Sequence, residues 1–409
     1  MTPEAANPEP GLDHHRTTSS RTEIFRLFLR LGLTCFGGPI AHIEYFRDEF
    51  VVRRQWIDEH GYADLVSLCQ FLPGPASSKV GFCIGLMRAG YPGAIAAWAG
   101  FTLPSAIILV CFAYVSSALH GPVGQGLLHG LKLAAVAIVA QAVWSMAHAL
   151  CPDRERASIA AFSAIAILAT GSSAVQIVVI VLGAIAGLWF CRGSRTSPGL
   201  VAMPVSRTAG VIAFVAFAVL FLGLPLLASF SQSSGIALFD AFYRSGALVF
   251  GGGHVVLPLL REAFVTPGWI SDNAFLAGYG AAQAIPGPLF AFAAYLGTIA
   301  PTQTQGLSGA ALGLVGIFLP GFLILLGTLP LWDALRRQAN AQAAMRGINA
   351  AVVGLLGAAF YNPVWTGTIH SVGDVCIALT GFILLNLWQM RPLGVVVFCA
   401  TAGIAMSFI

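Results

Sequence analysis

The chain has 409 residues, of which 57% are hydrophobic and only 9% charged, and its formal net charge is +4. A soluble domain usually carries about 25% charged residues, so the composition excludes a soluble protein. It predicts instead an all-α, polytopic protein that lies in a lipid bilayer. Most Lys and Arg side chains lie in short connecting segments, which indicates membrane orientation rather than nucleic-acid binding.

About thirteen transmembrane segments are predicted along the chain. We expect residues 1–22, which are polar and Pro-rich, to form a disordered cytoplasmic tail without a signal peptide. The apolar segments lie near 24–40, 62–88, 91–118, 126–150, 157–170, 173–191, 208–230, 236–253, 274–300, 306–332, 341–362, 367–387 and 393–409.

The sequence predicts a transporter rather than an enzyme. It contains no nucleophile elbow, no H-E-x-x-H string and no Walker A string. The eight cysteines lie mostly in apolar segments, without a C-x-x-C pair, so we interpret them as small hydrophobic residues. We therefore expect no cofactor and no metal site, and transport that runs on an ion gradient or on exchange.

Five strings of the first half return in order in the second half. "FGGPIAHIEYFRDEF" from Phe36 aligns with "FGGGHVVLPLLREAF" from Phe250, including the neighbours Arg47-Asp48 and Arg261-Glu262. The other matches pair "QWIDEHGYADL" with "GWISDNAFLAG", "QFLPGP" with "QAIPGP", "GFTLPSAIIL" with "GIFLPGFLIL", and "HGLKLAAVAIV" with "RGINAAVVGLL". These matches predict a first repeat at 23–191, a linker and connecting segment at 192–235, and a second repeat at 236–409.

The charges indicate that the second repeat is inverted relative to the first. Arginines lie in the connections expected inside and are missing from those expected outside after residues 118, 170, 230, 300 and 362. The exception is 41–61, expected outside, which carries Arg47, Arg53 and Arg54. Either 24–40 does not fully cross, or these arginines are functional or paired with nearby acids; the sequence leaves both readings open.

Two Pro-Gly-Pro strings interrupt apolar segments at equivalent places of the two repeats. Inverted repeats with interrupted helices are typical of secondary transporters, whose sites lie near the bilayer midplane. The half-helix after Pro75 would direct free N–H groups and a positive dipole end at an anion, with hydroxyls and a lysine beside it. The alternative is a proline kink that serves packing alone.

Two further groups of residues are candidates. The glycine strings at 37–38 and 251–253 allow close backbone approach to a ligand, or serve helix packing. His254 follows the second string and could donate to an anion or carry a proton. Charged residues in apolar segments are costly and mark functional sites, although a lysine or arginine near a segment end can also reach the interface. They are Lys79, Lys132, Arg244, Asp240 and Asp374, the two aspartates being counter-ions or membrane-edge residues.

Taken together, "FGGPIAHIEYFRDEFV", "QFLPGPASSKVG", "GFTLPSA", "FGGGHVVLPLL" and "FLAGYGAAQAIPGPLF" resemble the chromate ion transporter family in its long, two-domain form. The resemblance covers roughly residues 23–365. It implies two homologous halves of opposite orientation in the inner membrane of a bacterial cell. It also implies export of chromate, and hence chromate resistance. The partners implied are chromate, with sulfate as competitor or alternative substrate, and the lipid bilayer; a homodimer is left open.

We therefore expect an exporter that works by alternating access, with a sulfate or other oxyanion permease or antiporter, and an anion channel, as alternatives. The residues expected to bind substrate are Gln70, Pro73, Gly74, Pro75, Ser77, Ser78, Lys79, Gly251, Gly252, Gly253, His254, Gln283, Pro286, Gly287 and Pro288. The residues expected to couple or gate transport are Gly37, Gly38, His42, Glu44, Arg47, Lys132, Arg244 and Arg261.

Overall fold

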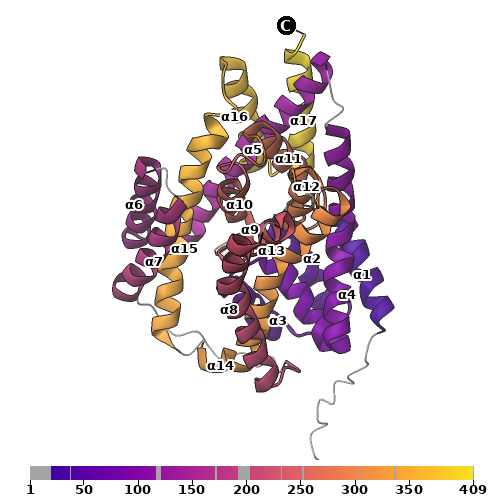
Figure 1. The fold of residues 1–409 in the computed structure, drawn as a ribbon, viewed down its shortest axis with the longest axis vertical. Coiled ribbons are helices and arrows are strands. Elements are labelled where there is room, and N and C mark those ends of the chain that lie inside the picture. The colour runs from indigo at the N-terminus through magenta and orange to yellow at the C-terminus, as the bar shows by residue number, and fades with distance from the viewer. Residues whose placement is uncertain are drawn as a thin grey trace, which may run out of the picture.

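The computed structural model describes residues 20–36, 38–116, 121–170, 173–191, 203–231, 233–250, 253–302, 304–335 and 338–408. Within these ranges every regular element is a helix, which confirms the all-α prediction (Figure 1). Most of the expected tail and residues 192–202 of the expected linker lie outside the described residues. Five helices are long and apolar enough to cross a membrane, so the protein is a multi-pass membrane protein: Ala76–Ser116, Gly121–Leu150, Arg207–Phe230, Leu307–Leu331 and Ala339–Trp365.

The helices of the two halves follow each other in the same order. The first half contains α1 (Arg21–Thr34), α2 (Gly38–Arg47), the π-helical turn η1 (Asp48–Arg53), α3 (Glu59–Phe71), α4 (Ala76–Ser116), α5 (Gly121–Leu150), α6 (Arg154–Thr170) and α7 (Ser173–Phe190). The connecting helix is α8 (Arg207–Phe230). The second half contains α9 (Ser234–Ala247), η2 (Gly253–Val255), α10 (Val256–Phe264), α11 (Asp272–Ala284), η3 (Leu289–Ala291), α12 (Phe292–Ile299), α13 (Leu307–Thr328), η4 (Leu329–Leu331), α14 (Trp332–Leu335), α15 (Ala339–Ala359), η5 (Phe360–Trp365), α16 (Val372–Asn386) and α17 (Pro392–Met406).

The first predicted segment, 24–40, does not cross the membrane. Arg54 Nη1 lies 3.3 Å from Glu23 Oε1, so the chain after α2 returns to the end at which α1 begins. The helices α1 and α2 therefore form a hairpin that enters the membrane and comes back. This resolves the charge exception, because the arginines of 41–61 lie at the same end as the N-terminal side of α1. We call this end of the molecule the inner end.

The first Pro-Gly-Pro string lies at the tip of a second hairpin. The guanidinium of Arg88 lies 4.6 Å from the centre of the Trp56 ring, so the first segment of α4 (residues 76–88) returns to the inner end. The chain then reverses at Gly90, whose φ of +64° belongs to the left-handed region. A Cβ built on Gly85 would lie 2.4 Å from the carbonyl oxygen of Gly93, which shows how closely the two segments of α4 pack. Only the second segment (residues 91–116) crosses to the outer end.

The second half repeats this plan from the outer end. Tyr295 Oη donates to the carbonyl oxygen of Ala274 (3.0 Å), so α12 returns to the end at which α11 begins. The rings of Phe242 and Phe264 lie 4.5 Å apart, which packs α10 back against α9. The count of about thirteen crossing segments is therefore not confirmed, because 24–40, 62–88, 236–253 and 274–300 lie in hairpins. At the two Pro-Gly-Pro strings the chain reverses at a glycine with positive φ, Gly74 and Gly287.

The helices form one core and two flanking bundles. The core consists of α1–α4 and α9–α13, with α8 packed outside α9 and α13. The α5 bundle consists of α5, α16 and α17, and the α15 bundle consists of α15, α6 and α7 (Figure 1). Each bundle thus combines one helix of one repeat with two helices of the other. Figure 1 shows α16 and α17 at the upper, outer end, and α14 at the lower, inner end.

Candidate functional site

Each Pro-Gly-Pro break is held by the other half of the protein. The amide of Gly74 donates to the carbonyl oxygen of Val249 (2.7 Å), and the amide of Gly287 donates to that of Cys35 (3.0 Å). Cys35 and Val249 occupy equivalent positions, each directly before the phenylalanine of a glycine string. One bond therefore joins the tip between α3 and α4 to the tip between α9 and α10. The other joins the tip between α11 and α12 to the tip between α1 and α2, also at mid-depth.

Both breaks require glycine at their centre. Gly74 has φ +96° and Gly287 has φ +104°, a region that disfavours side chains. A Cβ on Gly74 would lie 3.1 Å from Cα of Gly321, and one on Gly287 would lie 2.9 Å from Oγ of Ser105. Gly321 and Ser105 are again equivalent, since each follows the proline of a repeated Leu-Pro string. The break and its packing partner are therefore duplicated together.

The two glycine strings meet at the same centre. A Cβ on Gly38 would lie 4.0 Å from Nε2 of His254, and one on Gly253 would lie 2.9 Å from Cγ of Pro39. The expected site residues Gly37, Gly251 and Gly252 lie outside the described residues. The starts of α2, η2, α4 and η3 consequently converge, and such starts carry free N–H groups and partial positive charge.

Two histidines lie against these breaks. His42 on α2 is buried, and its Nδ1 lies 3.4 Å from Oγ of Ser77 at the start of α4. Nδ1 of His254 lies 2.9 Å from Oη of Tyr279 on α11. The histidines do not occupy equivalent positions of the two repeats, so the site combines a symmetric backbone with asymmetric side chains.

Besides Nε2 of His42, three buried polar atoms of the site have no hydrogen-bond partner among the described residues. They are Oγ of Ser78, Oγ1 of Thr102 and Nε2 of Gln283. An unsatisfied buried polar group costs about 1–3 kcal/mol, so these atoms are placed to bind a ligand or water. They come from both segments of α4 and from the end of α11, which are the elements that form the two breaks.

Lys79 supports the first break directly. Its ammonium donates to the carbonyl oxygens of Leu72 (2.7 Å) and Pro73 (2.9 Å), which the break frees from helical bonding, and the side chain is fully buried. None of the ion pairs in the described part of the chain includes Lys79. Among the described residues, the Lys79 ammonium therefore faces carbonyl oxygens and no carboxylate. The second repeat has Phe292 at the equivalent position.

The structure places several expected residues away from this centre. Gln70 is exposed at the end of α3, whereas its equivalent Gln283 is half-buried at the second break. Glu44 is exposed on α2. Arg244 pairs with Asp240 one turn earlier on α9 (3.0 Å), which makes Asp240 the counter-ion of Arg244.

The two equivalent arginines form a duplicated ion pair with the next helix. Arg47 Nε lies 2.7 Å from Oε1 of Glu59, and Arg261 Nε lies 3.0 Å from Oδ1 of Asp272. Arg47 holds the pKa of the Glu59 carboxyl below its usual value by hydrogen bonding to it. The acids that follow the arginines directly in the sequence are not their partners. Each ion pair instead joins the end of one re-entrant hairpin to the start of the next.

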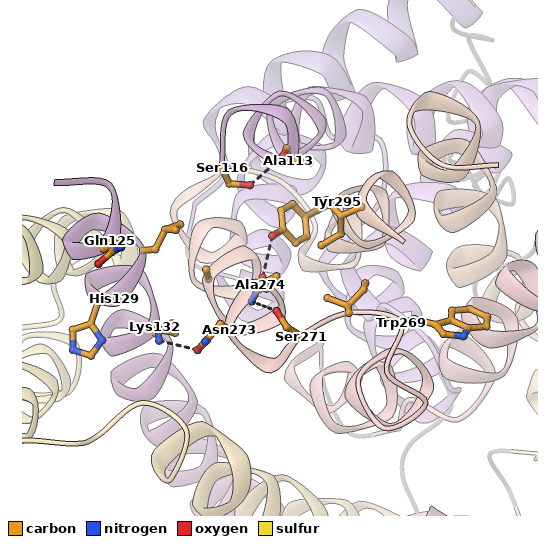
Figure 2. A pocket seen from close by; sticks show the side chains of 14 residues that line it. Ala113, Ser116, Gln125, His129, Lys132, Trp269, Ser271, Asn273, Ala274 and Tyr295 are labelled. Carbon is orange, nitrogen blue, oxygen red and sulfur yellow. Dashed lines mark hydrogen bonds between the residues drawn. The ribbon is translucent and has the colours of Figure 1, made fainter. Parts of the chain in front are cut away.

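A cavity of about 690 Å³ opens at the outer end, between α4, α5, α11 and α12 (Figure 2). Lys132 projects into it and donates to Oδ1 of Asn273 (3.1 Å). On the same helix, Nε2 of His129 lies 2.6 Å from Oδ1 of Asp374, whose Oδ2 accepts the backbone N–H groups of His370 and Ser371 directly before α16. Lys132 therefore belongs to an outer vestibule and not to the central site.

Sequence reasoning missed Thr102, Ser105 and Tyr279 as site residues. Thr102 and Ser105 flank Pro104 in the repeated string "GFTLPSA", and Tyr279 lies in "FLAGYGAAQAIPGPLF". For Thr102 and Ser105, their place in a repeated string was a signal that could have found them, whereas Tyr279 lies between two repeated strings. Which of their atoms point to the breaks depends on helix packing, which the strings do not encode.

The fold and the site define a class of protein. They describe a helical membrane protein with two homologous, inverted halves and helix breaks at mid-depth, the architecture of secondary transporters. The family model "Chromate transporter" matches residues 22–188 and 236–404, so the chain belongs to the chromate transporter family.

Relatives of similar length support this assignment. The chain is 28% identical to the chromate transport protein of Pseudomonas aeruginosa over 94% of this chain and 92% of that protein. It is 26% identical to a probable chromate transport protein of Synechococcus elongatus over 96% and 98% of the two chains. It is 24% identical to the chromate transport protein of Cupriavidus metallidurans over 92% and 90%. No solved structure matches the chain.

Proposed function

We propose that this protein exports chromate across the bacterial cytoplasmic membrane by alternating access, and thereby confers chromate resistance. The observation that carries the proposal is that unpartnered polar atoms lie together with a buried lysine, which has no carboxylate partner among the described residues, at two joined helix breaks. Chromate is a tetrahedral dianion, which helix starts, hydroxyls and amides bind well. The family assignment supports chromate as the transported anion.

In this mechanism the dianion binds between the breaks at Gly74 and Gly287. Ser78, Thr102 and Gln283 donate to its oxygens, and Lys79 supplies positive potential from behind the first break. The core then moves relative to the two bundles, and the anion leaves through the outer vestibule past Lys132. Sulfate has the same shape and charge, and the donors of this site would bind it in the same way.

The test is flux of both anions in everted membrane vesicles from cells that produce the protein, with an imposed pH gradient. We expect saturable, gradient-driven accumulation of chromate that excess sulfate reduces, together with increased chromate tolerance of the cells. Sulfate uptake without chromate flux or tolerance would identify a sulfate permease instead. A large conductance that does not saturate would identify a channel.

A further inference from the structure

The α5 bundle closes the outer side of the core along a tight seam with α11. A Cβ built on Gly280 would lie 2.1 Å from the carbonyl oxygen of Leu131. On this face of α11, Leu276 is buried and Gln283 is half-buried. Nearer the outer end, Lys132 donates to Asn273 across the same two helices. We call this contact between α5 and α11 the outer seam. It separates the vestibule from the second break.

The equivalent seam on the inner side is open. Ser67 corresponds to Gly280, since each lies three residues before the glutamine of a Pro-Gly-Pro string, and Ile348 corresponds to Leu131 in the "RGINAAV" and "HGLKLAA" strings. On α3, however, Ala63, Ser67 and Gln70 are all exposed. The face of α3 that repeat symmetry pairs with α15 is therefore uncovered, and we call these two surfaces of α3 and α15 the inner seam.

The contacts within the bundles show that this difference is confined to the core seams. A Cβ on Gly130 would lie 2.3 Å from the carbonyl oxygen of Cys399, and one on the equivalent Gly347 would lie 1.9 Å from that of Gly183. The seam between α5 and α17 and the seam between α15 and α7 are thus closed alike. Both bundles are tightly packed. The core packs against the α5 bundle at the outer seam, whereas the equivalent inner seam between the core and the α15 bundle is open.

Polar groups at the inner seam complement each other. The residues equivalent to Lys132 and Asn273 are Asn349 on α15 and His60 on α3. Oδ1 of Asn349 is buried without a hydrogen-bond partner among the described residues, and His60 is exposed at the start of α3. Closing the inner seam would bring the basic side chain of His60, on the core, against the amide of Asn349, on the α15 bundle. At the outer seam the basic side chain, Lys132, is on the bundle and the amide, Asn273, is on the core.

We propose that the outer and inner seams are the two gates of the transporter, and that this structure is its inner-open state. In the outer-open state the core moves so that Ser67 packs against Ile348 while Gly280 separates from Leu131. This inference rests on the alternating access of the proposed function and assigns its gating residues. Repeat symmetry supports it, because two inverted halves that exchange their conformations convert one open side into the other.

Disulfide cross-linking tests the inner gate. A disulfide needs Cα atoms within about 7 Å, so the pair Ser67→Cys and Ile348→Cys, in a chain whose eight native cysteines are replaced, reports closure of the inner seam. We expect oxidation to trap this pair and stop chromate flux, and reduction to restore the flux. We also expect Ser67→Cys alone to react with an impermeant maleimide from the cytoplasmic face but not from the outer face.

A wedge at the outer seam provides an independent readout. Gly280→Val removes the room for the Leu131 carbonyl, so it should disfavour the inner-open state and raise the cross-linking yield several-fold. Gly223→Val is the matched control, because a Cβ there meets no atom within 4 Å, and it should leave the yield unchanged. Chromate flux without any cross-link, in the parent and in the wedge variant alike, would overturn the assignment of the gates. Cross-linking in a protein that moves no chromate would instead leave the gates standing and reject the proposed substrate.

Discussion

The amide of Gly74 donates a hydrogen bond to the carbonyl oxygen of Val249, 2.7 Å away in the other half of the protein. The equivalent bond joins Gly287 to Cys35. These contacts make each helix break a junction between repeats, because the freed backbone groups of one half are satisfied by the other. The central site therefore depends on both halves being assembled together.

Substitution of the break glycines should cost more than strain alone. We expect Gly74→Ala and Gly287→Ala to lower the thermal stability of the purified protein and to abolish chromate flux. The left-handed φ costs about 1–3 kcal/mol for a side chain, and the added Cβ also meets Gly321 or Ser105. The control is Gly268→Ala, which has φ +80° but open space around its Cβ. An equal loss of stability in all three variants would contradict a role for close packing at the breaks.

Two substitutions of Lys79 should separate its charge from its hydrogen bonds. Lys79→Gln keeps an amide donor near the Leu72 and Pro73 carbonyls but removes the charge, so we expect normal amounts in the membrane and at least about tenfold slower chromate efflux. Lys79→Met leaves both carbonyls without their donor and should also reduce the amount of folded protein. Amounts are measured by immunoblot of washed membranes, and efflux in everted vesicles. Unchanged efflux by Lys79→Gln would show that the charge does not act on the anion.

The two equivalent glutamines should respond differently to the same substitution. We expect Gln283→Glu to raise the KM for chromate about tenfold or more, because a carboxylate replaces a buried donor and repels the dianion. Gln70→Glu, at the exposed end of α3, should raise the KM much less. Initial rates in everted vesicles at several chromate concentrations measure both values. Similar KM changes in the two variants would remove Gln283 from the binding site.

The duplicated ion pair predicts a specific rescue. Arg47→Glu should reduce chromate tolerance, and the double variant Arg47→Glu, Glu59→Arg should recover it, because the pair joins the first hairpin to α3. Both side chains are about half-exposed and screened by solvent, so the loss of the pair should change the stability of the protein little. The control is Arg47→Glu with Asp48→Arg, which restores the charge but not the contact. Equal recovery by this control would assign the effect to net charge.

Several features could be read from the sequence because they depend on local chemistry. Hydropathy shows that the protein lies in a membrane, and proline and glycine show where its helices break. The repeated strings identify equivalent positions, and the positions of Gly74 and Gly287 at the two breaks follow from them. The sequence also predicted the duplication on which every structural equivalence above depends.

The remaining features were decided by packing between distant segments. Hydropathy alone did not settle whether 24–40 crosses or returns, and the contact of Arg54 with Glu23 does. The nearest acid in the sequence is not the partner of Arg47, because a hairpin brings Glu59 closer. Likewise Gln70 and Gln283 have the same local sequence pattern but different burial. Their environments differ because the core lies against one bundle and away from the other, and only the tertiary structure determines that choice.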